Sequence, residues 1–185
     1  MRDNLFSCRR CGVCCKNLIT KAHGCHIGLF LMKHEVNLFP PSTVSPCWAI
    51  GMKGRSRPRP DVKSYQLNVE RCPHLSQKNL CRIYEKRPMI CRAHPLTLHV
   101  DPMTRRITSA SVDSKCVTCK ELGIGEEGTF EYLGQFFSED ILRANVGMTN
   151  YLAWMFPQLG MKVWLYDLKN KQWQQITAEI AEIMR

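Results

Sequence analysis

The feature that most constrains this chain is a cluster of four cysteines within eight residues near its start, in the segment SCRRCGVCCKN. Cys8, Cys11 and Cys14 follow one another at intervals of three, and Cys15 is the direct neighbour of Cys14. Thiolates are soft ligands that bind zinc and iron–sulfur clusters, so this density of sulfur indicates a metal centre. We call residues 8–15 the first cysteine set.

A second cysteine set lies in the segment RCPHLSQKNLCRIYEKRPMICRAHP, and a C-x2-C pair follows it. Ligands this far apart in sequence share a metal only if the fold brings them together. For the C-x2-C pair we expect at least one ligand, with Cys119 preferred over Cys116. The predicted metal ligands are Cys8, Cys11, Cys14, Cys15, Cys72, Cys81, Cys91, Cys116 and Cys119.

The two remaining cysteines carry weaker signals. Cys25 has a histidine on either side of it and completes a metal site only if His23 or His26 joins it. Cys47, in the segment SPCWAI, is expected to be a small buried hydrophobic residue, because free cysteine is among the most buried residue types.

Net charge is distributed unevenly between the two ends of the chain. The formal net charge is +10; residues 1–110 hold 19 basic and 6 acidic residues, and residues 111–185 hold 7 and 10. A basic surface attracts nucleic acid or another polyanion. The basic part is also the cysteine-rich part, so arginine and lysine can instead offset the negative charge of bound thiolates. Nucleic acid is therefore a possible partner but not the favoured one.

The lack of a signal peptide and of a membrane-spanning run indicates the compartment. The first residues, MRDNLFSCRR, have no apolar run after their charges, so no signal peptide is expected. The longest apolar run, IGLFLM, is far too short to cross a membrane. We expect a cytoplasmic protein without membrane contact, where dense cysteines indicate metal or redox chemistry more often than disulfides.

The predicted fold class is α+β, in two parts. Residues 1–125 are expected to form a small, irregular, cysteine-rich metal-binding domain with short hairpins and helices. Residues 126–185 are expected to form a more helical C-terminal extension that packs on this domain or on a protein partner. Residues 51–61, rich in Gly, Pro and Arg, are the best candidate for a mobile loop.

Hydrophobic spacing predicts the individual elements. A buried strand followed by a helical turn should end at Pro40–Pro41. The segments LTLHV and ITSASV predict a hairpin, and so does MKVWLYDLKNKQWQQI. Apolar spacing after Phe130 predicts two helices, the second capped by Ser138, and AEIAEIMR predicts a closing helix.

The chain resembles the CxxCxxCC cysteine-cluster family, which is described as zinc- or iron-chelating. The resemblance covers CRRCGVCC, CPHL and CRIYEKRPMICRAHP, over about residues 6–125. It implies a metal site and adds Cys119 through the segment CKELGIGEEG. His94 stands where the family pattern has an aromatic residue. A more distant resemblance links the cysteine cluster to flagellin lysine N-methylases, but no site for a methyl-transfer cofactor is visible.

Residues beside the second cysteine set have predicted supporting roles. Arg87 and Arg92 flank Cys91 and are predicted to bind the cofactor, because their N–H groups can donate to thiolates. Ile83 and Tyr84 are expected to pack a core behind the site.

The function that best fits these signals is metal binding, in an electron-transfer, metal-handling or accessory protein. Thiolate ligands scattered along the chain favour an iron–sulfur cluster, with zinc as the alternative cofactor. The competing functions are a cluster-dependent modification enzyme and a zinc-stabilised RNA- or ribosome-binding module; no catalytic residue is predicted. Because adjacent residues reach one tetrahedral ion only with difficulty, we expect Cys14 and Cys15 to serve different metal atoms.

Overall fold

The computed structural model describes residues 5–51, 61–101, 104, 106–155 and 162–176, and it confirms the α+β class. The strands are β1 (Thr20–Ala22), β2 (Cys25–Ile27), β3 (Phe30–Met32), β4 (Val44–Pro46), β5 (Trp48–Gly51), β6 (Ser64–Leu67), β7 (Leu96–Val100), β8 (Ile107–Val112), β9 (Glu127–Gly128), β10 (Lys162–Asp167) and β11 (Gln172–Ile176). The α-helices are α1 (Met89–Ala93), α2 (Val117–Glu121), α3 (Phe130–Gly134) and α4 (Glu139–Met155). Short 3-10 helices are η1 (Val13–Cys15), η2 (Lys33–Leu38), η3 (Pro41–Thr43) and η4 (Tyr84–Lys86).

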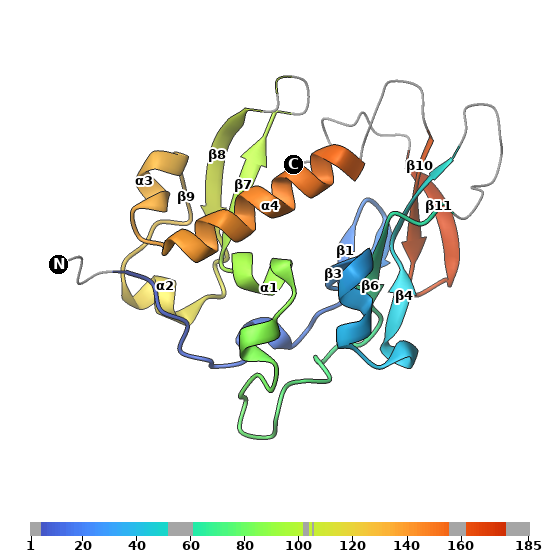
Figure 1. Cartoon of the computed structure of the whole chain (residues 1–185), viewed down its shortest axis with the longest axis horizontal. Helices are drawn as coiled ribbons and strands as arrows, with labels where there is room; N and C mark the ends of the chain where they lie inside the picture. The colour runs from blue at the N-terminus through green and yellow to red at the C-terminus, as the bar shows by residue number, and fades with distance from the viewer. Residues whose placement is uncertain (1–4, 52–60, 102–103, 105, 156–161, 177–185) are drawn as a thin grey trace.

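The strands form two lobes on opposite sides of the molecule (Figure 1). The first lobe is the antiparallel sheet β7-β8-β9 with α2 and α3, around a core that contains Leu96, Leu133 and Phe137. The second lobe contains the sheets β11-β10-β5, β3-β6-β4 and β1-β2, around cores that contain Leu31 and Leu165.

Helix α4 crosses from one lobe toward the other and packs on α1 (Figure 1). The buried Asn145 side chain donates one hydrogen bond to the Ala93 carbonyl of α1, at 2.9 Å, and one to Ile141. A Cβ atom on Gly147 would lie 3.0 Å from Met89 Sδ, so the two helices approach closely at a residue without a side chain. The position of α1 is therefore fixed by the long helix.

The described elements confirm most of the predicted local structure. Strand β3 leads into η2, which ends before Pro40, and both predicted hairpins form as β7–β8 and β10–β11. Helix α4 begins directly after Ser138, whose carbonyl accepts the first helical hydrogen bonds. The predicted closing helix at 178–185 and nearly all of the predicted loop 51–61 lie outside the described residues.

The C-terminal extension contains strands as well as helices in its described part. Strand β10 pairs antiparallel with β5, so residues 162–165 share a sheet with residues 48–51. The described part of the extension therefore packs directly on the residues before it. Among the described residues, no helix is long and apolar enough to cross a membrane.

Candidate metal centre

Eight of the eleven cysteines line one cavity of about 70 Å³ between the two lobes. They come from four segments of the chain: the first cysteine set, the loop 71–82, helix α1 and the start of α2. The lining cysteines are Cys8, Cys11, Cys14, Cys15, Cys72, Cys81, Cys91 and Cys116. The fold therefore brings together all but one of the predicted ligands.

Cys14 and Cys15 lie in η1, which is turned by Gly12. Gly12 has a φ of 73°, in the left-handed region that favours glycine, and its carbonyl accepts a hydrogen bond from Cys15 N at 3.2 Å. A Cβ atom here would lie 2.9 Å from Leu75 Cδ1 and 3.0 Å from Asn79 O. The glycine therefore permits the turn and also lets the first cysteine set approach the loop of the second.

The loop 71–82 positions Cys72 and Cys81. Cys72 N donates to the Cys15 carbonyl at 3.0 Å, next to an antiparallel bridge between Lys16 and Arg71. A further bridge joins Leu75 and Cys81, so the loop folds back on itself. Backbone pairing thus brings both sulfurs to the Cys14–Cys15 turn.

Cys91 lies on α1, whose start is held by a buried carboxylate. Glu35 accepts a hydrogen bond from Met89 N at 2.7 Å through one oxygen and from Met32 N at 2.9 Å through the other. Because Asn145 holds the other end of α1, the helix is tied at both ends. Cys91 is thereby placed in the wall of the cavity.

Cys116 lies at the opposite wall, directly before α2, and Cys119 lies behind it within that helix. Cys116 precedes the helix, its backbone N–H donates to the Asp113 carbonyl at 2.9 Å, and Cys119 is buried one turn later. Cys8 and Cys116 both pack against the first-lobe core, which contains Cys119. Cys119 is not part of the cavity lining but contacts Cys116.

His94 and Asp113 border the same wall and were not predicted as site residues. His94 Nδ1 lies 3.7 Å from Asp113 Oδ2, and both residues line the cavity. Burial opposes ionisation of Cys116, but hydrogen bonds with His94 and Cys119 outweigh it and hold the pKa of Cys116 below its usual value. The only signal in the sequence that could have identified His94 as a site residue is that it stands where the family pattern has an aromatic residue.

The cysteines at the other wall have the opposite tendency. Contact with the Cys14 thiol, together with burial, raises the pKa of Cys15 to about 12, against a smaller opposing effect of Cys72. Contact with Cys15 raises the pKa of Cys72, and burial raises that of Cys91 despite the nearby Arg87. These thiols are neutral at pH 7, so a metal that binds them must displace protons.

Tyr84 and Arg87 line the cavity, whereas Arg92 does not. The guanidinium of Arg87 lies 3.8 Å from the centroid of the Tyr84 ring, and its Nε donates to the Tyr84 carbonyl at 2.9 Å. The prediction that Tyr84 packs a core behind the site is wrong; Ile83 does pack on the second-lobe core. Arg92 is exposed and lines a neighbouring hollow, so its cofactor-binding role stays a prediction.

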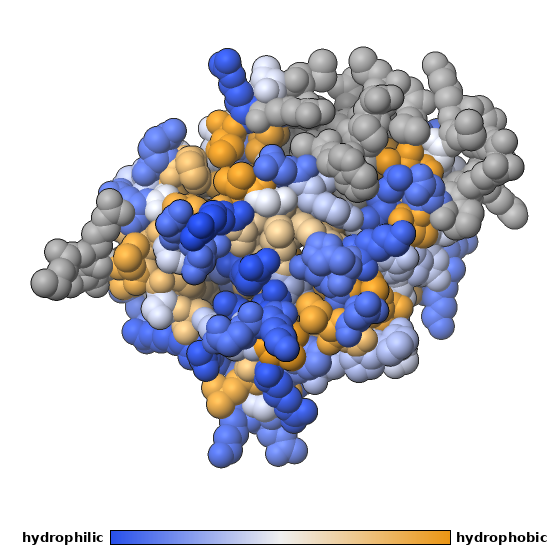
Figure 2. Space-filling view, in the orientation of Figure 1, coloured by the Kyte–Doolittle hydropathy of each residue, from blue (hydrophilic) through white to orange (hydrophobic). Residues whose placement is uncertain are grey.

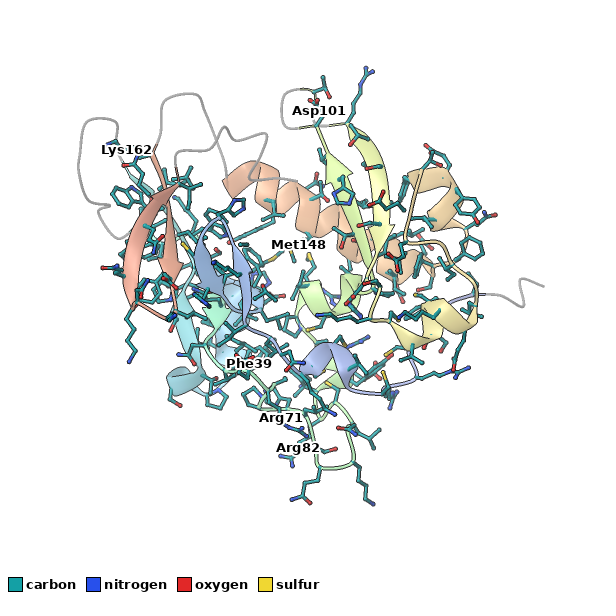
Figure 3. The ribbon with its side chains drawn as sticks, turned by 180° about the vertical axis from the view of Figure 1, so that it is seen from behind. Phe39, Arg71, Arg82, Asp101, Met148 and Lys162 are labelled. Carbon is teal, nitrogen blue, oxygen red and sulfur yellow. The ribbon has the colours of Figure 1, made fainter. Side chains whose placement is uncertain are left out.

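The basic residues divide between the cavity and the outer surface. Those that line the cavity are Arg9, Arg10, Arg87 and Lys115. Those that lie exposed outside it include Arg71, Lys78, Arg82 and Lys86. Figure 3 shows Arg71 and Arg82 on the projecting loop 71–82. The face in Figure 2 carries many hydrophilic side chains, interspersed with apolar ones. The cavity-lining group can offset the charge of bound thiolates, and the exposed group can attract a polyanion.

Cys25 and Cys47 lie away from the cavity, in the second lobe. Both are buried, with Cys47 at 2% exposure, so the prediction of a small buried hydrophobic residue is confirmed for Cys47. Cys25 Sγ donates to Gln174 Oε1 at 3.2 Å, and His26 faces the buried Asp167 carboxylate at 3.6 Å. Neither cysteine lines the cavity.

The donor set fits a thiolate metal centre in its chemistry. Sulfur is the shared ligand type of zinc sites and iron–sulfur clusters, and the cavity offers eight sulfurs. Within the described ranges, no three Cys, His, Asp or Glu side chains are already grouped as a metal site. The thiols contact one another instead, so metal binding requires their side chains to turn toward a common point.

Comparison with known protein families gives a match that covers the cysteine region. A family model named CxxCxxCC, described as "Putative zinc- or iron-chelating domain", matches residues 7–120, a range that includes all nine predicted ligands. No curated protein and no solved structure matches the chain.

Proposed function

Because the chain belongs to the CxxCxxCC family of zinc- or iron-chelating domains, we propose that its cysteine-lined cavity holds a thiolate metal centre that exchanges metal or electrons with a partner protein. One observation carries this proposal: four separate segments contribute eight cysteines to a single cavity. A fold that used cysteine only for packing would distribute it among its cores, as it does with Cys25 and Cys47.

The cysteines form two groups at opposite walls, which suits a multinuclear centre. The first wall is defined by Cys14, Cys15, Cys72, Cys81 and Cys91, which influence one another's ionisation. The second wall is defined by Cys8 and Cys116, which pack on the first-lobe core beside the buried Cys119. Cys11 is the eighth cysteine of the lining. Scattered thiolates of this kind support an iron–sulfur cluster as the preferred cofactor, with zinc as the alternative.

The exposure of the first cysteine set supports an exchange role. Cys11 and Cys14 are exposed, and Val13 between them is 38% exposed. Structural zinc sites are closed by four protein ligands, so exposed ligands favour a centre that a partner can reach. The partner proposed here approaches the first cysteine set; contact through the C-terminal extension remains a second prediction.

The test is analysis of metal and acid-labile sulfide in full-length protein purified without oxygen. Iron with a similar amount of sulfide, in a coloured protein, is the expected result. Colourless protein with zinc and no sulfide would overturn the iron–sulfur preference and leave the ligand assignments standing. Protein that binds neither metal, even after reduction and reconstitution, would overturn the proposed function.

A second candidate function is a cluster-dependent modification enzyme, which requires a pocket beside the centre. A hollow of about 760 Å³ adjoins the cavity and shares Cys8, Tyr84, Arg87 and His94 with it. A small ligand in this hollow would contact the second wall. Absorption of the metal-loaded protein that shifts on addition of azide would favour this candidate; an unchanged spectrum would favour the exchange role.

A further inference from the structure

Tyr84 joins the two cysteine sets through a pair of arginines. The guanidinium carbon of Arg10 lies 3.9 Å from the centroid of the Tyr84 ring, and that of Arg87 lies 3.8 Å from it. Two guanidinium groups this close to one centroid would overlap on a single face, so they occupy opposite faces of the ring. Arg10 belongs to the first cysteine set, whereas Tyr84 and Arg87 precede Cys91 in the second.

The backbone of Arg10 is held in an unusual conformation. Its φ is 55°, in the left-handed region that a residue with a side chain rarely adopts. The Arg10 N–H donates to Cys8 Sγ, at 3.4 Å. Residues keep such conformations only where their surroundings fix them, and the Tyr84 ring supplies that contact for the side chain.

The other half of the stack is tied to the helix that carries Cys91. Arg87 Nε donates to the Tyr84 carbonyl at 2.9 Å, and Arg87 Nη1 donates to the Cys91 carbonyl at 3.5 Å. All three stacked residues line the cavity. A continuous chain of contacts therefore runs from Cys8 Sγ, through Arg10, Tyr84 and Arg87, to the Cys91 carbonyl.

We propose that Tyr84 is a positioning residue for the metal centre: the Arg10–Tyr84–Arg87 stack holds Cys8 and Cys91 at opposite walls and places two permanent positive charges beside the thiolates. The inference rests on the proposed function. Groups that contact and orient metal ligands typically change metal affinity by about 10- to 100-fold when removed. An aromatic ring is the essential feature, because a cation is attracted to the face of phenylalanine as well as tyrosine.

The experiment titrates the metal-free, full-length protein with Co²⁺ without oxygen and follows the thiolate-to-cobalt absorption. Tyr84→Leu, which keeps an apolar side chain but removes the ring, should bind Co²⁺ about tenfold more weakly. Its absorption per bound cobalt should also fall, because Cys8 is no longer aligned. Tyr84→Phe should match the wild type in both measurements.

Two further variants keep the test decisive if Tyr84→Leu does not fold. Arg10→Gln removes one cation from the stack at an exposed position and should weaken Co²⁺ binding in the same direction. Arg82→Gln, an exposed arginine outside the cavity, is the matched control and should have no effect.

The outcomes separate this inference from the proposed function. A wild-type protein that gives no thiolate-to-cobalt absorption and also holds neither iron nor zinc after reconstitution would contradict the metal centre itself. A wild-type protein that binds, with Tyr84→Leu and Arg10→Gln equal to it in affinity and spectrum, would overturn only the positioning role of Tyr84.

Discussion

The cysteines of the cavity and the buried pair in the second lobe show how differently one residue type is used in this molecule. In the cavity, thiols from distant segments contact one another, and two of them are exposed. In the second lobe, Cys25 and Cys47 are buried in a core that also contains Trp48, Val163 and Leu165. Sulfur is available for ligation in the first region and serves as apolar packing in the second.

The environment of the thiols explains this difference. Burial is the largest cause that raises the pKa of Cys47 and of Cys25, so both thiols stay neutral and unreactive. In the cavity, mutual contacts between thiols contribute to the pKa values, and a metal ion can replace those contacts. Burial also raises the pKa of Cys91 in the cavity, and Cys25 lies near Cys47 in the second lobe, so contact among several thiols is what the cavity adds.

The largest expected effect is the loss of metal on replacing cavity cysteines, compared with replacing the buried pair. Replacing one cysteine at each wall, in the double variant Cys15→Ser/Cys116→Ser, should abolish stable metal binding, as measured by elemental analysis after gel filtration. The matched double variant Cys25→Ala/Cys47→Ala should keep the wild-type metal content and lose about 1 kcal/mol of stability per site. Metal loss in the second variant would show that the buried pair is also required.

A partial effect is expected for the adjacent cysteines taken one at a time. If Cys14 and Cys15 serve different metal atoms, Cys14→Ser and Cys15→Ser should each lose a separate share of the metal. Each single variant should therefore differ from the wild type in stoichiometry or affinity. If Cys15→Ser keeps all of the metal and Cys14→Ser loses all of it, Cys14 and Cys15 do not serve different metal atoms.

A smaller effect is expected at the turn of the first cysteine set. Gly12→Ala should destabilise the protein by about 1–3 kcal/mol and weaken metal binding, because the new Cβ meets Leu75 and Asn79 at a positive φ. Gly24→Ala is the matched control: its φ is 77°, but nothing lies within 4 Å of the added Cβ. Thermal unfolding of both variants separates backbone strain from the close approach of the two cysteine sets. Equal losses would show that the contact with Leu75 and Asn79 is unimportant.

The smallest expected effect is on the alkaline stability of the metal-free protein. Cys15 titrates near 9.0 when unfolded and at about 12 when folded, so between these values the folded state holds more protons. Its contribution to stability is therefore complete below pH 9 and is lost as the pH rises toward 12. Denaturant unfolding at several pH values should show this decline, and Cys15→Ser should make it shallower. An unchanged slope in that variant would assign the decline to other groups.

Short-range patterns predicted much of the local structure of this protein. The hairpins β7–β8 and β10–β11 and the end of η2 before Pro40 follow from spacing and turn residues within about fifteen positions. The predicted burial of Cys47 was also confirmed. These features depend on neighbouring residues, which a sequence displays directly.

The sequence by itself predicted a sulfur-based metal centre and named nine cysteines as its candidate ligands. Only the tertiary structure decided which eight of them share a cavity, because loop 71–82, α1 and α2 reach the first cysteine set through long-range contacts. It also moved Tyr84 from the expected core to a stack between Arg10 and Arg87, and it brought His94 and Asp113 to the second wall. Such neighbours come from distant parts of the chain, and their meeting depends on packing of the whole fold rather than on local spacing.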